Sequence, residues 1–241
     1  MEVLALMGIR GGSKGLPGKN VRLLAGKPLF KWGIDAAKRS SFVGRVIVST
    51  DSEEYRQLVL DNEIESPYLR PNKFATDGSP EIDFIANLLE WLEQNEGYCP
   101  DICVRLLATV PMQLEDDIDK SVSMLVENNQ IDSSVVIAES RQHPVKALEI
   151  LDDTGLCVPY GKTTADTGDI TPKDRAQYKK SYHRANIITF KPENIKKYGS
   201  LTGMMCLPHV ISQDRAIDID TEVDFWCAEA IMNKLNWSGK Y

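Results

Sequence analysis

Apolar runs of strand length alternate with amphipathic segments along the first part of the chain. Continuous apolar runs predict strands at residues 3–9, 45–50, 102–107 and 133–138. Between these runs, apolar positions recur every three or four residues, which predicts helices at 29–40, 52–61, 81–93 and 115–128. Apolar strands that alternate with helices are typical of a mostly parallel sheet covered on both faces. The pattern therefore predicts an α/β fold, a three-layer sandwich around that sheet.

The hydrophobic pattern then changes. Two short segments at 145–151 and 156–158 flank a polar turn, which predicts a hairpin. The polar stretch 161–180 has no clear period, and a connection of that length is typical of a functional loop or an interaction arm. We therefore expect an arm at 145–183, inserted into a single domain that spans residues 1–241. Two more strands and a final helix are expected at 185–190, 204–211 and 221–235.

Length and composition are those of an ordinary folded domain. The chain has 241 residues, of which 42% are hydrophobic and 26% charged, and it can bury one substantial core. No run approaches the roughly eighteen apolar residues of a membrane span, and the N-terminus lacks the pattern of a secretion signal. These observations predict a cytoplasmic protein with no membrane partner.

Charge and cysteine usage narrow the class of protein further. The net charge of −7 argues against nucleic acid as a partner, because a phosphate backbone attracts basic proteins. The five cysteines are odd in number and scattered, with no Cys-x-x-Cys pair. We expect them to be reduced and mostly buried, as in cytoplasmic proteins.

One loop is an exception to the acidic balance of the chain. Four glycines stand between residues 11 and 18, several cations stand among them, and no Asp or Glu occurs from 3 to 34. Glycine lets a backbone approach its ligand closely, and a cationic loop after a strand is suited to phosphate. The spacing fits neither a Walker A loop nor the dinucleotide fingerprint. The alternative is a solvated turn whose cations face water. The residues expected to bind an anion are Arg10, Gly11, Gly12, Ser13, Lys14 and Lys19.

Two aspartates near the carboxyl end form a second candidate site. Asp218 and Asp220 alternate with isoleucines, so in a strand both carboxylates project from one face. Paired carboxylates are suited to a hard cation, and Mg²⁺ held there would bridge to a triphosphate on the glycine-rich loop. The alternative is that one aspartate caps the following helix while the other is solvated.

Two further segments carry candidate binding residues. Arg70 lies before a proline, after the second strand and helix, where loops form the binding crevice of such sheets, and it is a candidate for reading a base edge. Lys146, with Arg175 and Gln177 in the later polar stretch, is a candidate for contacting an acidic sugar or a phosphate. A surface turn and a solvated loop are the alternatives. Asp51 is the expected cap of the second helix, because Glu54 completes the spacing of a capping box.

Taken together, these motifs resemble those of the CMP-sialic acid synthetases, the acylneuraminate cytidylyltransferases. The resemblance implies the Rossmann-like fold of nucleotidyltransferases and a homodimer whose arm, here 145–183, reaches into the partner's site. It also implies that the anomeric hydroxyl of a sugar acid attacks the α-phosphorus of CTP and releases pyrophosphate. The residues that carry the resemblance are 10–20, 48–51, 70–71, 75–77, 143–146 and 217–222.

The resemblance also implies roles for individual residues. On the nucleotide side, the triphosphate would be held by Arg10, Ser13 and Lys19, the ribose would lie near Asn20, and cytosine would be recognised by Arg70 with the backbone around Ala75 and Thr76. Asp218 and Asp220 would coordinate Mg²⁺ and, with Arg10 and Lys19, form the catalytic set. The acceptor side would comprise Thr109, Lys146, Arg175 and Gln177.

The chain departs from the family's pattern on the acceptor side. Where the family commonly has Leu-Gln-Pro-Thr-Ser-Pro-Leu-Arg, residues 106–113 have Leu-Leu-Ala-Thr-Val-Pro-Met-Gln. Leu107 and Gln113 thereby replace a glutamine and an arginine, and Arg184-Ala185-Asn186 replaces Asn-Gly-Ala. The acceptor stays open among sialic, legionaminic and pseudaminic acids and other 3-deoxy-ulosonates. The alternative functions are a nucleotidyltransferase that uses another NTP or a sugar 1-phosphate, and a catalytically silent nucleotide-binding module.

Overall fold

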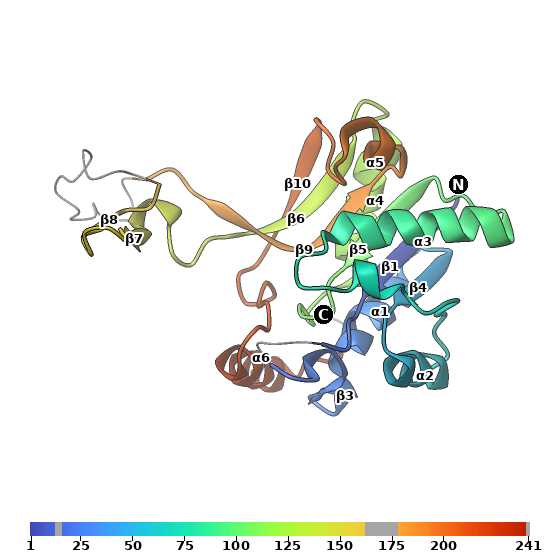
Figure 1. Ribbon diagram of the computed structural model, residues 1–241, viewed down its shortest axis with the longest axis horizontal. Coiled ribbons are helices and arrows are strands. Elements are labelled where there is room, and N and C mark those ends of the chain that lie inside the picture. The colour runs from blue at the N-terminus through green and yellow to red at the C-terminus, as the bar shows by residue number, and fades with distance from the viewer. Residues whose placement is uncertain (13–15, 162–177, 240–241) are drawn as a thin grey trace.

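A six-stranded sheet forms the centre of the molecule (Figure 1). The computed structural model describes residues 1–12, 16–161 and 178–239. Across the sheet the strands lie in the order β10 (Cys206–Ile211), β6 (Ser133–Glu139), β9 (Tyr182–Phe190), β5 (Ile102–Leu106), β1 (Val3–Gly8) and β4 (Arg45–Ser49). Only β9 runs antiparallel to its neighbours among these strands. The predicted α/β fold with a mostly parallel sheet is confirmed.

Helices cover both faces of the sheet. One face carries α1 (Leu29–Arg39), α2 (Glu53–Asp61) and α4 (Glu115–Glu127), and the other carries α3 (Glu81–Glu96) and the short α5 (Glu193–Tyr198). Phe30 and Val122 lie in the core of the first face, and Phe84 and Phe190 in that of the second. Each such burial contributes roughly 1.5–3 kcal/mol, so the two cores fix the three layers against one another.

A third, smaller core ties the two ends of the chain together. Here α6 (Glu222–Lys234) packs against the short hairpin of β2 (Leu23–Leu24) and β3 (Lys27–Pro28) and the start of α1. Ile217 and Ile219 are buried in this core, whereas Asp218 and Asp220 between and after them are exposed. This core therefore holds the segment of Asp218 and Asp220 next to residues 24–29, which follow the glycine-rich loop.

A hairpin projects from the body of the molecule as an arm (Figure 1). It consists of the single-turn helix η3 (Pro144–Lys146) and the antiparallel strands β7 (Leu148–Ile150) and β8 (Cys157–Pro159). His143 precedes η3, and its Nδ1 accepts a hydrogen bond from the backbone N–H of Val145 at 3.3 Å. The predicted hairpin is confirmed, but its first strand is shorter than expected because η3 occupies the start of that segment.

The predicted cap of α2 was wrong. Ser52 caps this helix, and its Oγ accepts a hydrogen bond from the backbone N–H of Tyr55 at 3.3 Å. The carboxylate of Asp51 instead accepts a hydrogen bond from the backbone N–H of Gly11 at 3.0 Å. Asp51 therefore fastens the glycine-rich loop rather than the helix.

The cysteines are less buried than expected. Cys103 is buried, whereas the other four, Cys99, Cys157, Cys206 and Cys227, are exposed, and all five are free thiols. Across the described ranges, no helix combines the length and the apolar character that crossing a membrane requires.

A buried ion-pair network anchors the segment that leads to the aspartates. Asp117, in the first turn of α4, accepts hydrogen bonds from Arg215 on both carboxylate oxygens, and from the His209 ring of β10 at 3.1 Å. Burial alone would raise the pKa of Asp117, but the hydrogen bonds from His209 and Arg215 and the Arg215 charge outweigh it and lower this pKa. Arg215 lies three residues before Asp218, so the network fixes the backbone just before that aspartate.

Replacing Asp117 with asparagine is expected to lower the free energy of unfolding by about 3 kcal/mol, because Arg215 keeps a buried charge without its carboxylate. The lowered pKa means that this stabilisation is complete above the ordinary pKa of 3.8 and is lost as the pH falls below it. Urea unfolding at neutral and acidic pH measures both effects. The control is Asp116→Asn, exposed in the same helical turn, which should change stability by less than about 0.5 kcal/mol. Equal stability of the two variants would contradict the anchoring role.

Candidate active site

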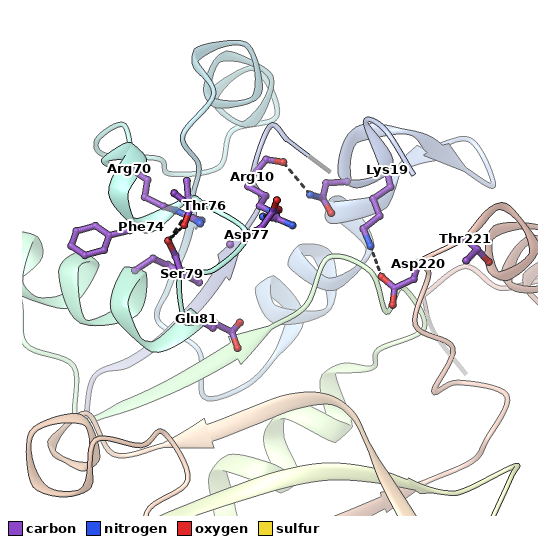
Figure 2. Close-up of a pocket in the computed structure, with 14 residues that line it drawn as sticks. Arg10, Lys19, Arg70, Phe74, Thr76, Asp77, Ser79, Glu81, Asp220 and Thr221 are labelled. Carbon is purple, nitrogen blue, oxygen red and sulfur yellow. Dashed lines mark hydrogen bonds and ion pairs between the residues drawn. The ribbon is translucent and has the colours of Figure 1, made fainter. Parts of the chain in front are cut away.

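A cavity of about 610 Å³ opens beside the carboxyl end of β1 (Figure 2). Three segments far apart in the sequence form its wall: the loop after β1, residues 70–84, and the pair Asp220 and Thr221. Loops at the carboxyl ends of parallel strands are the usual binding crevice of such sheets. Of the residues singled out from the sequence, those that line the cavity are Arg10, Lys19, Asn20, Arg70, Ala75, Thr76 and Asp220.

Glycines stand at both ends of the loop after β1 for structural reasons. At Gly8, the last residue of β1, a Cβ would lie 2.7 Å from a ring carbon of Phe84 and 2.9 Å from Arg70, so a larger residue would displace these side chains. Gly18 has φ of +69°, which glycine adopts without strain, and it starts the single-turn helix η1 (Lys19–Val21). Asn20 is buried and its amide donates to the backbone oxygen of Arg10 at 3.5 Å. Gly12 follows Gly11 at the exposed edge of this loop. Ser13 and Lys14 lie outside the described residues.

Both cations of the described part of this loop are engaged by acidic groups across the cavity. Arg10 Nη1 lies 2.7 Å from Asp77 Oδ1, and Lys19 Nζ lies 2.6 Å from Asp220 Oδ1 (Figure 2). Lys19 also donates to the backbone oxygen of Ile219 at 3.0 Å. The contact between Lys19 and Asp220 brings the glycine-rich loop and the aspartate segment into one site, although 201 positions separate them in the chain.

Arg70 forms the deep end of the cavity. Its side chain is buried, its Nε donates to Ser49 Oγ at 3.0 Å, and its Nη2 donates to the Ser49 backbone oxygen. The guanidinium lies 4.1 Å from the centre of the Phe84 ring, and burial lowers the pKa of Arg70 to about 10. Arg70 therefore stays charged at neutral pH in a fixed orientation, a geometry suited to hydrogen-bond a planar polar ligand.

A tight polar turn forms the part of the cavity wall that follows Arg70 in the chain. Residues 72–74 form the single-turn helix η2 (Asn72–Phe74), and the Thr76 and Ser79 hydroxyls lie 2.6 Å apart. Ser79 Oγ also donates to the Lys73 backbone oxygen at 2.9 Å. These bonds hold the backbone around Thr76 in place at the edge of the cavity.

The segment of the two aspartates is irregular rather than a strand, so that prediction was wrong. The backbone N–H of Ile219 donates to the Thr109 oxygen at 2.9 Å, and the Thr109 side chain hydrogen-bonds Asp218. Thr221, not Asp220, caps α6, and its hydroxyl accepts from the backbone N–H of Asp224 at 3.3 Å. Neither aspartate is therefore used as a helix cap: the Asp220 carboxylate pairs with Lys19, and the Asp218 carboxylate with Thr109.

The electrostatics of this segment favour a cation. Protein around the Asp218 carboxyl group partly desolvates it although the residue is exposed, and this desolvation and the charge of Asp220 raise the pKa of Asp218. The Thr109 hydrogen bond and the charge of Lys19 lower it, but they do not cancel the rise. Within the described ranges, no cluster of three or more His, Cys, Asp or Glu side chains forms a metal site. Two mutually repelling carboxylates fit Mg²⁺, which commonly takes one or two carboxylates and completes its shell with phosphate oxygens and water.

The structure describes two of the four acceptor-side candidates. Lys146 is on η3 in the arm, and Thr109 contacts the segment of Asp218. Arg175 and Gln177 lie outside the described residues. Gln113 is buried, and its amide donates to the backbone oxygens of Leu107 and Val110 at 3.2 and 2.5 Å. Gln113 therefore fastens the loop that carries Thr109.

Asn186 fastens the same loop from the other side. Its Oδ1 accepts from the backbone N–H of Leu107 at 2.5 Å, and its amide donates to the Val110 oxygen at 3.4 Å. The two departures from the family's pattern at Gln113 and Asn186 thus support the loop beneath Asp218.

Several cavity residues were not foreseen from the sequence. Gly8 and Phe84 pack around Arg70, while Ser79 and Glu81 add polar groups to the wall. Asp77 also lines the wall; it belongs to the segment 75–77 that carries the resemblance, but no role was expected of it. Ser79 lies three residues after Thr76 and Glu81 begins α3, so extending the motif into the next helix would have found them.

Comparison with known proteins identifies the family of this chain. A family model described as Cytidylyltransferase matches residues 4–202. The CMP-N,N'-diacetyllegionaminic acid synthase of Legionella pneumophila is 29% identical over 244 residues, covering 96% of this chain and 97% of that protein. The N-acylneuraminate cytidylyltransferase of Streptococcus agalactiae is 28% identical over 227 residues, 93% of this chain, which spans only 52% of that protein's length.

A solved structure extends the likeness to the fold. A CMP:2-keto-3-deoxy-manno-octonic acid synthetase complexed with CTP aligns with a TM-score of 0.70 at 15% identity, covering 98% of this chain and 100% of that one. The family match covers most of the chain and includes the glycine-rich loop and Arg70. This chain belongs to the cytidylyltransferase family.

Proposed function

We propose that this chain activates a 3-deoxy-ulosonic sugar acid, a sugar of the sialic acid type, by transferring CMP to it from CTP and releasing pyrophosphate. The observation that carries the proposal is the contact of Lys19 with Asp220, which joins a cationic loop to paired carboxylates in one cavity. The relatives named above act on acids of this kind by their printed names, and the solved neighbour holds CTP.

The loop residues would bind the triphosphate. When it enters, the phosphates replace Asp77 as the partner of Arg10, and Lys19 turns from Asp220 toward the phosphate oxygens. Backbone N–H groups of the glycine-rich loop add donors that cost no reorganisation when the reaction occurs. Arg70 and the backbone around Ala75 and Thr76 would hold the cytosine at the deep end of the cavity.

Asp218 and Asp220 would hold Mg²⁺. When bound, the ion supplies Lewis-acid stabilisation of charge on the phosphate oxygens. The release of Lys19 from Asp220 frees that carboxylate at the moment the triphosphate arrives. Thr109 orients Asp218 through its hydrogen bond and supports the backbone at Ile219.

The transfer is a displacement at the α-phosphorus. The anomeric hydroxyl of the sugar acid forms the new phosphorus–oxygen bond, the bond to the β-phosphate oxygen breaks, and the hydroxyl proton leaves to solvent or to a nearby base. Negative charge grows on the non-bridging and leaving oxygens, where Arg10 and Lys19 would stabilise it. Holding both substrates in one cleft supplies much of the remaining acceleration.

The arm would pair two copies of the chain. Val145, Leu148, Ile150, Leu156 and Tyr160 are 48–73% exposed on this small hairpin. Exposed apolar side chains concentrated in one projection are typical of an interaction site. A homodimer would cover them and would bring Lys146 toward the partner's cavity. Because the reaction consumes CTP, we place the protein in the cytoplasm.

A panel assay tests the proposed function. The protein is incubated with Mg²⁺, each of CTP, UTP, ATP and GTP, and each of sialic, legionaminic, pseudaminic and 3-deoxy-manno-octulosonic acids or a sugar 1-phosphate. CTP binding is measured separately by calorimetry. Pyrophosphate release is measured and any product is identified by mass. We expect release with CTP and at least one acid, together with the mass of the CMP-sugar. CTP binding without release for every acid would support a silent nucleotide-binding module, and release with a sugar 1-phosphate would support the other alternative.

A further inference from the structure

We infer that Glu81 selects cytosine over uracil, because its carboxylate, positioned by Arg105, accepts a hydrogen bond from the 4-amino group of CTP. This inference rests on the proposed function and goes beyond it by naming the residue that distinguishes CTP from UTP. Neither Glu81 nor Arg105 was a candidate from the sequence.

Glu81 places a carboxylate in the wall of the nucleotide cavity (Figure 2). It is the first residue of α3, and its side chain is 35% exposed. Its Oε2 lies 3.1 Å from Nε of Arg105, whereas its Oε1 accepts no hydrogen bond from any residue that the structure describes. One oxygen is therefore held by the protein, and the other is available to a ligand.

Arg105 holds this carboxylate from outside the cavity. It belongs to β5, is only 7% exposed and is not part of the cavity wall. Its Nη1 donates to the backbone oxygen of Asn186 at 2.7 Å, which fixes the guanidinium against the sheet. A buried charge without a partner is costly, so Arg105 favours an ionised Glu81. A nucleotide in the cavity leaves this ion pair intact.

The other carboxylates of the described wall belong to the phosphate end of the cavity. Asp77 pairs with Arg10, and Asp220 pairs with Lys19. Both pairs would open when the triphosphate takes the two cations. Of the acidic side chains in the described wall, Glu81 is thus the one whose partner is not needed for phosphate.

Helix α3 places Glu81 beside the end of the cavity that would hold the base. Phe84 follows Glu81 by three residues, so the two side chains are neighbours on one face of the helix. The centre of the Phe84 ring lies 4.1 Å from the Arg70 guanidinium. Arg70 binds Ser49 through Nε and Nη2, and its Nη1 donates to no acceptor among the described residues. This end of the cavity therefore presents donors from Arg70 and an acceptor from Glu81.

Cytosine matches this arrangement of donors and acceptor. Its polar edge carries two acceptors, O2 and N3, next to one donor, the 4-amino group, whereas uracil carries an oxygen in place of the amine. An ionised carboxylate only accepts hydrogen bonds, and glutamate commonly accepts one from the cytosine amine. The uracil oxygen would face the Glu81 oxygen with no hydrogen between them, and such a contact rejects the wrong base. The ribose hydroxyls are the other donors of CTP, and the test separates them from the amine.

Glutamine at position 81 would replace the acceptor with a donor. Arg105 offers only N–H groups, so the amide oxygen of Glu81→Gln would take the place of Oε2 and the amide nitrogen would point toward the ligand. The change conserves volume, and a thermal melt checks the fold. The matched control is Asp83→Asn, which removes a carboxylate from the same first turn of α3 but not from the cavity wall.

The dissociation constants of CTP, UTP, 2′-deoxy-CTP and 3′-deoxy-CTP are measured by calorimetry with Mg²⁺ and without any sugar acid, so that binding is observed apart from the transfer. We expect wild type to bind CTP at least about tenfold more tightly than UTP, the effect of a charge-assisted hydrogen bond. Glu81→Gln should weaken CTP binding by about the same factor, tighten UTP binding and leave the discrimination against both deoxynucleotides unchanged. Asp83→Asn should behave as wild type.

A double variant, Glu81→Gln with Arg105→Met, decides the case if the single variant does not fold, since it leaves no buried charge unpaired. Its amide can turn either way, so the preference for CTP should fall without a gain for UTP. An unchanged ratio of the CTP and UTP constants in the folded glutamine variant, or altered discrimination against the deoxynucleotides instead, would overturn the inference. If wild type releases no pyrophosphate with any acid but still binds CTP more tightly than UTP, the proposed function fails and the assignment of Glu81 is tested by binding alone.

Discussion

Replacing Lys19 with methionine is expected to lower kcat/KM for CTP by about 10²–10³-fold, the usual cost of removing one preorganised charged donor from a transition state. Lys19 joins the glycine-rich loop to the aspartate segment, because its Nζ donates hydrogen bonds to the Asp220 carboxylate and to the backbone oxygen of Ile219. Methionine keeps the length and apolar stem of the side chain, so packing is maintained. Steady-state kinetics with CTP as the varied substrate measure the effect.

The matched control is Lys38→Met. Lys38 also donates to a backbone oxygen, that of Glu63 at 2.9 Å, but it lies on α1 away from the cavity. Its variant should keep kcat/KM within about twofold of wild type, since changes at exposed positions alter stability by less than about 0.5 kcal/mol. Comparable losses in both variants would mean that the Lys19 effect is general destabilisation, and the assignment of Lys19 to the triphosphate would be wrong.

Asp218→Asn is expected to reduce turnover by at least about 100-fold at low Mg²⁺, because the metal would lose one of its two carboxylates. A high Mg²⁺ concentration should restore part of the activity, since Asp220 remains. The raised pKa of Asp218 adds a pH signature. In the metal-free protein its carboxylate accepts a proton at a higher pH than an ordinary aspartate, and this proton competes with Mg²⁺. The Mg²⁺ concentration that gives half the maximal wild-type rate should therefore rise earlier as the pH falls, and the asparagine variant should lack that rise.

Asp214→Asn serves as the control for this prediction. Asp214 lies four residues upstream, and its carboxylate accepts a hydrogen bond from the Arg215 backbone N–H at 3.1 Å. Its loss should leave the Mg²⁺ dependence of the rate unchanged. If Asp218→Asn also shows wild-type Mg²⁺ dependence across the pH range, Asp218 does not hold the metal.

The layered fold could be predicted because its signals are local. A strand buried on both faces must be apolar throughout, as Val3–Gly8 is, and a helix that covers a sheet must repeat apolar positions every three or four residues, as Glu81–Glu96 does. The glycine-rich loop could also be recognised, because its glycines stand among cations soon after a strand, and the positive φ of Gly18 is a conformation that glycine adopts without strain.

Tertiary competition decided the features that were predicted wrongly. Asp51 and Ser52 both have side chains that can cap a helix. The Asp51 carboxylate accepts a hydrogen bond from the Gly11 backbone N–H instead, and Ser52 caps the helix. The alternation of isoleucine and aspartate at 217–220 fits a strand, but Thr109 and the third core, not a neighbouring strand, hold this segment. Neither outcome can be read from spacing along the chain.

The buried Arg105 was not singled out for a related reason. It stands within an apolar run that predicts a buried strand. Its partners, the Glu81 carboxylate and the backbone oxygen of Asn186, come from two other segments of the chain. Long-range pairing of this kind has no periodicity in the sequence.

A crystal structure of the protein grown with CTP and Mn²⁺, which stands in for Mg²⁺ and scatters anomalously, tests most directly whether the two ends of the chain share one metal-bound nucleotide. An anomalous peak coordinated by Asp218, Asp220 and phosphate oxygens is the predicted result, with Arg10 and Lys19 on the triphosphate and cytosine beside Arg70. A nucleotide bound outside this cavity, or a manganese ion bound to the triphosphate with neither aspartate among its ligands, would contradict the account.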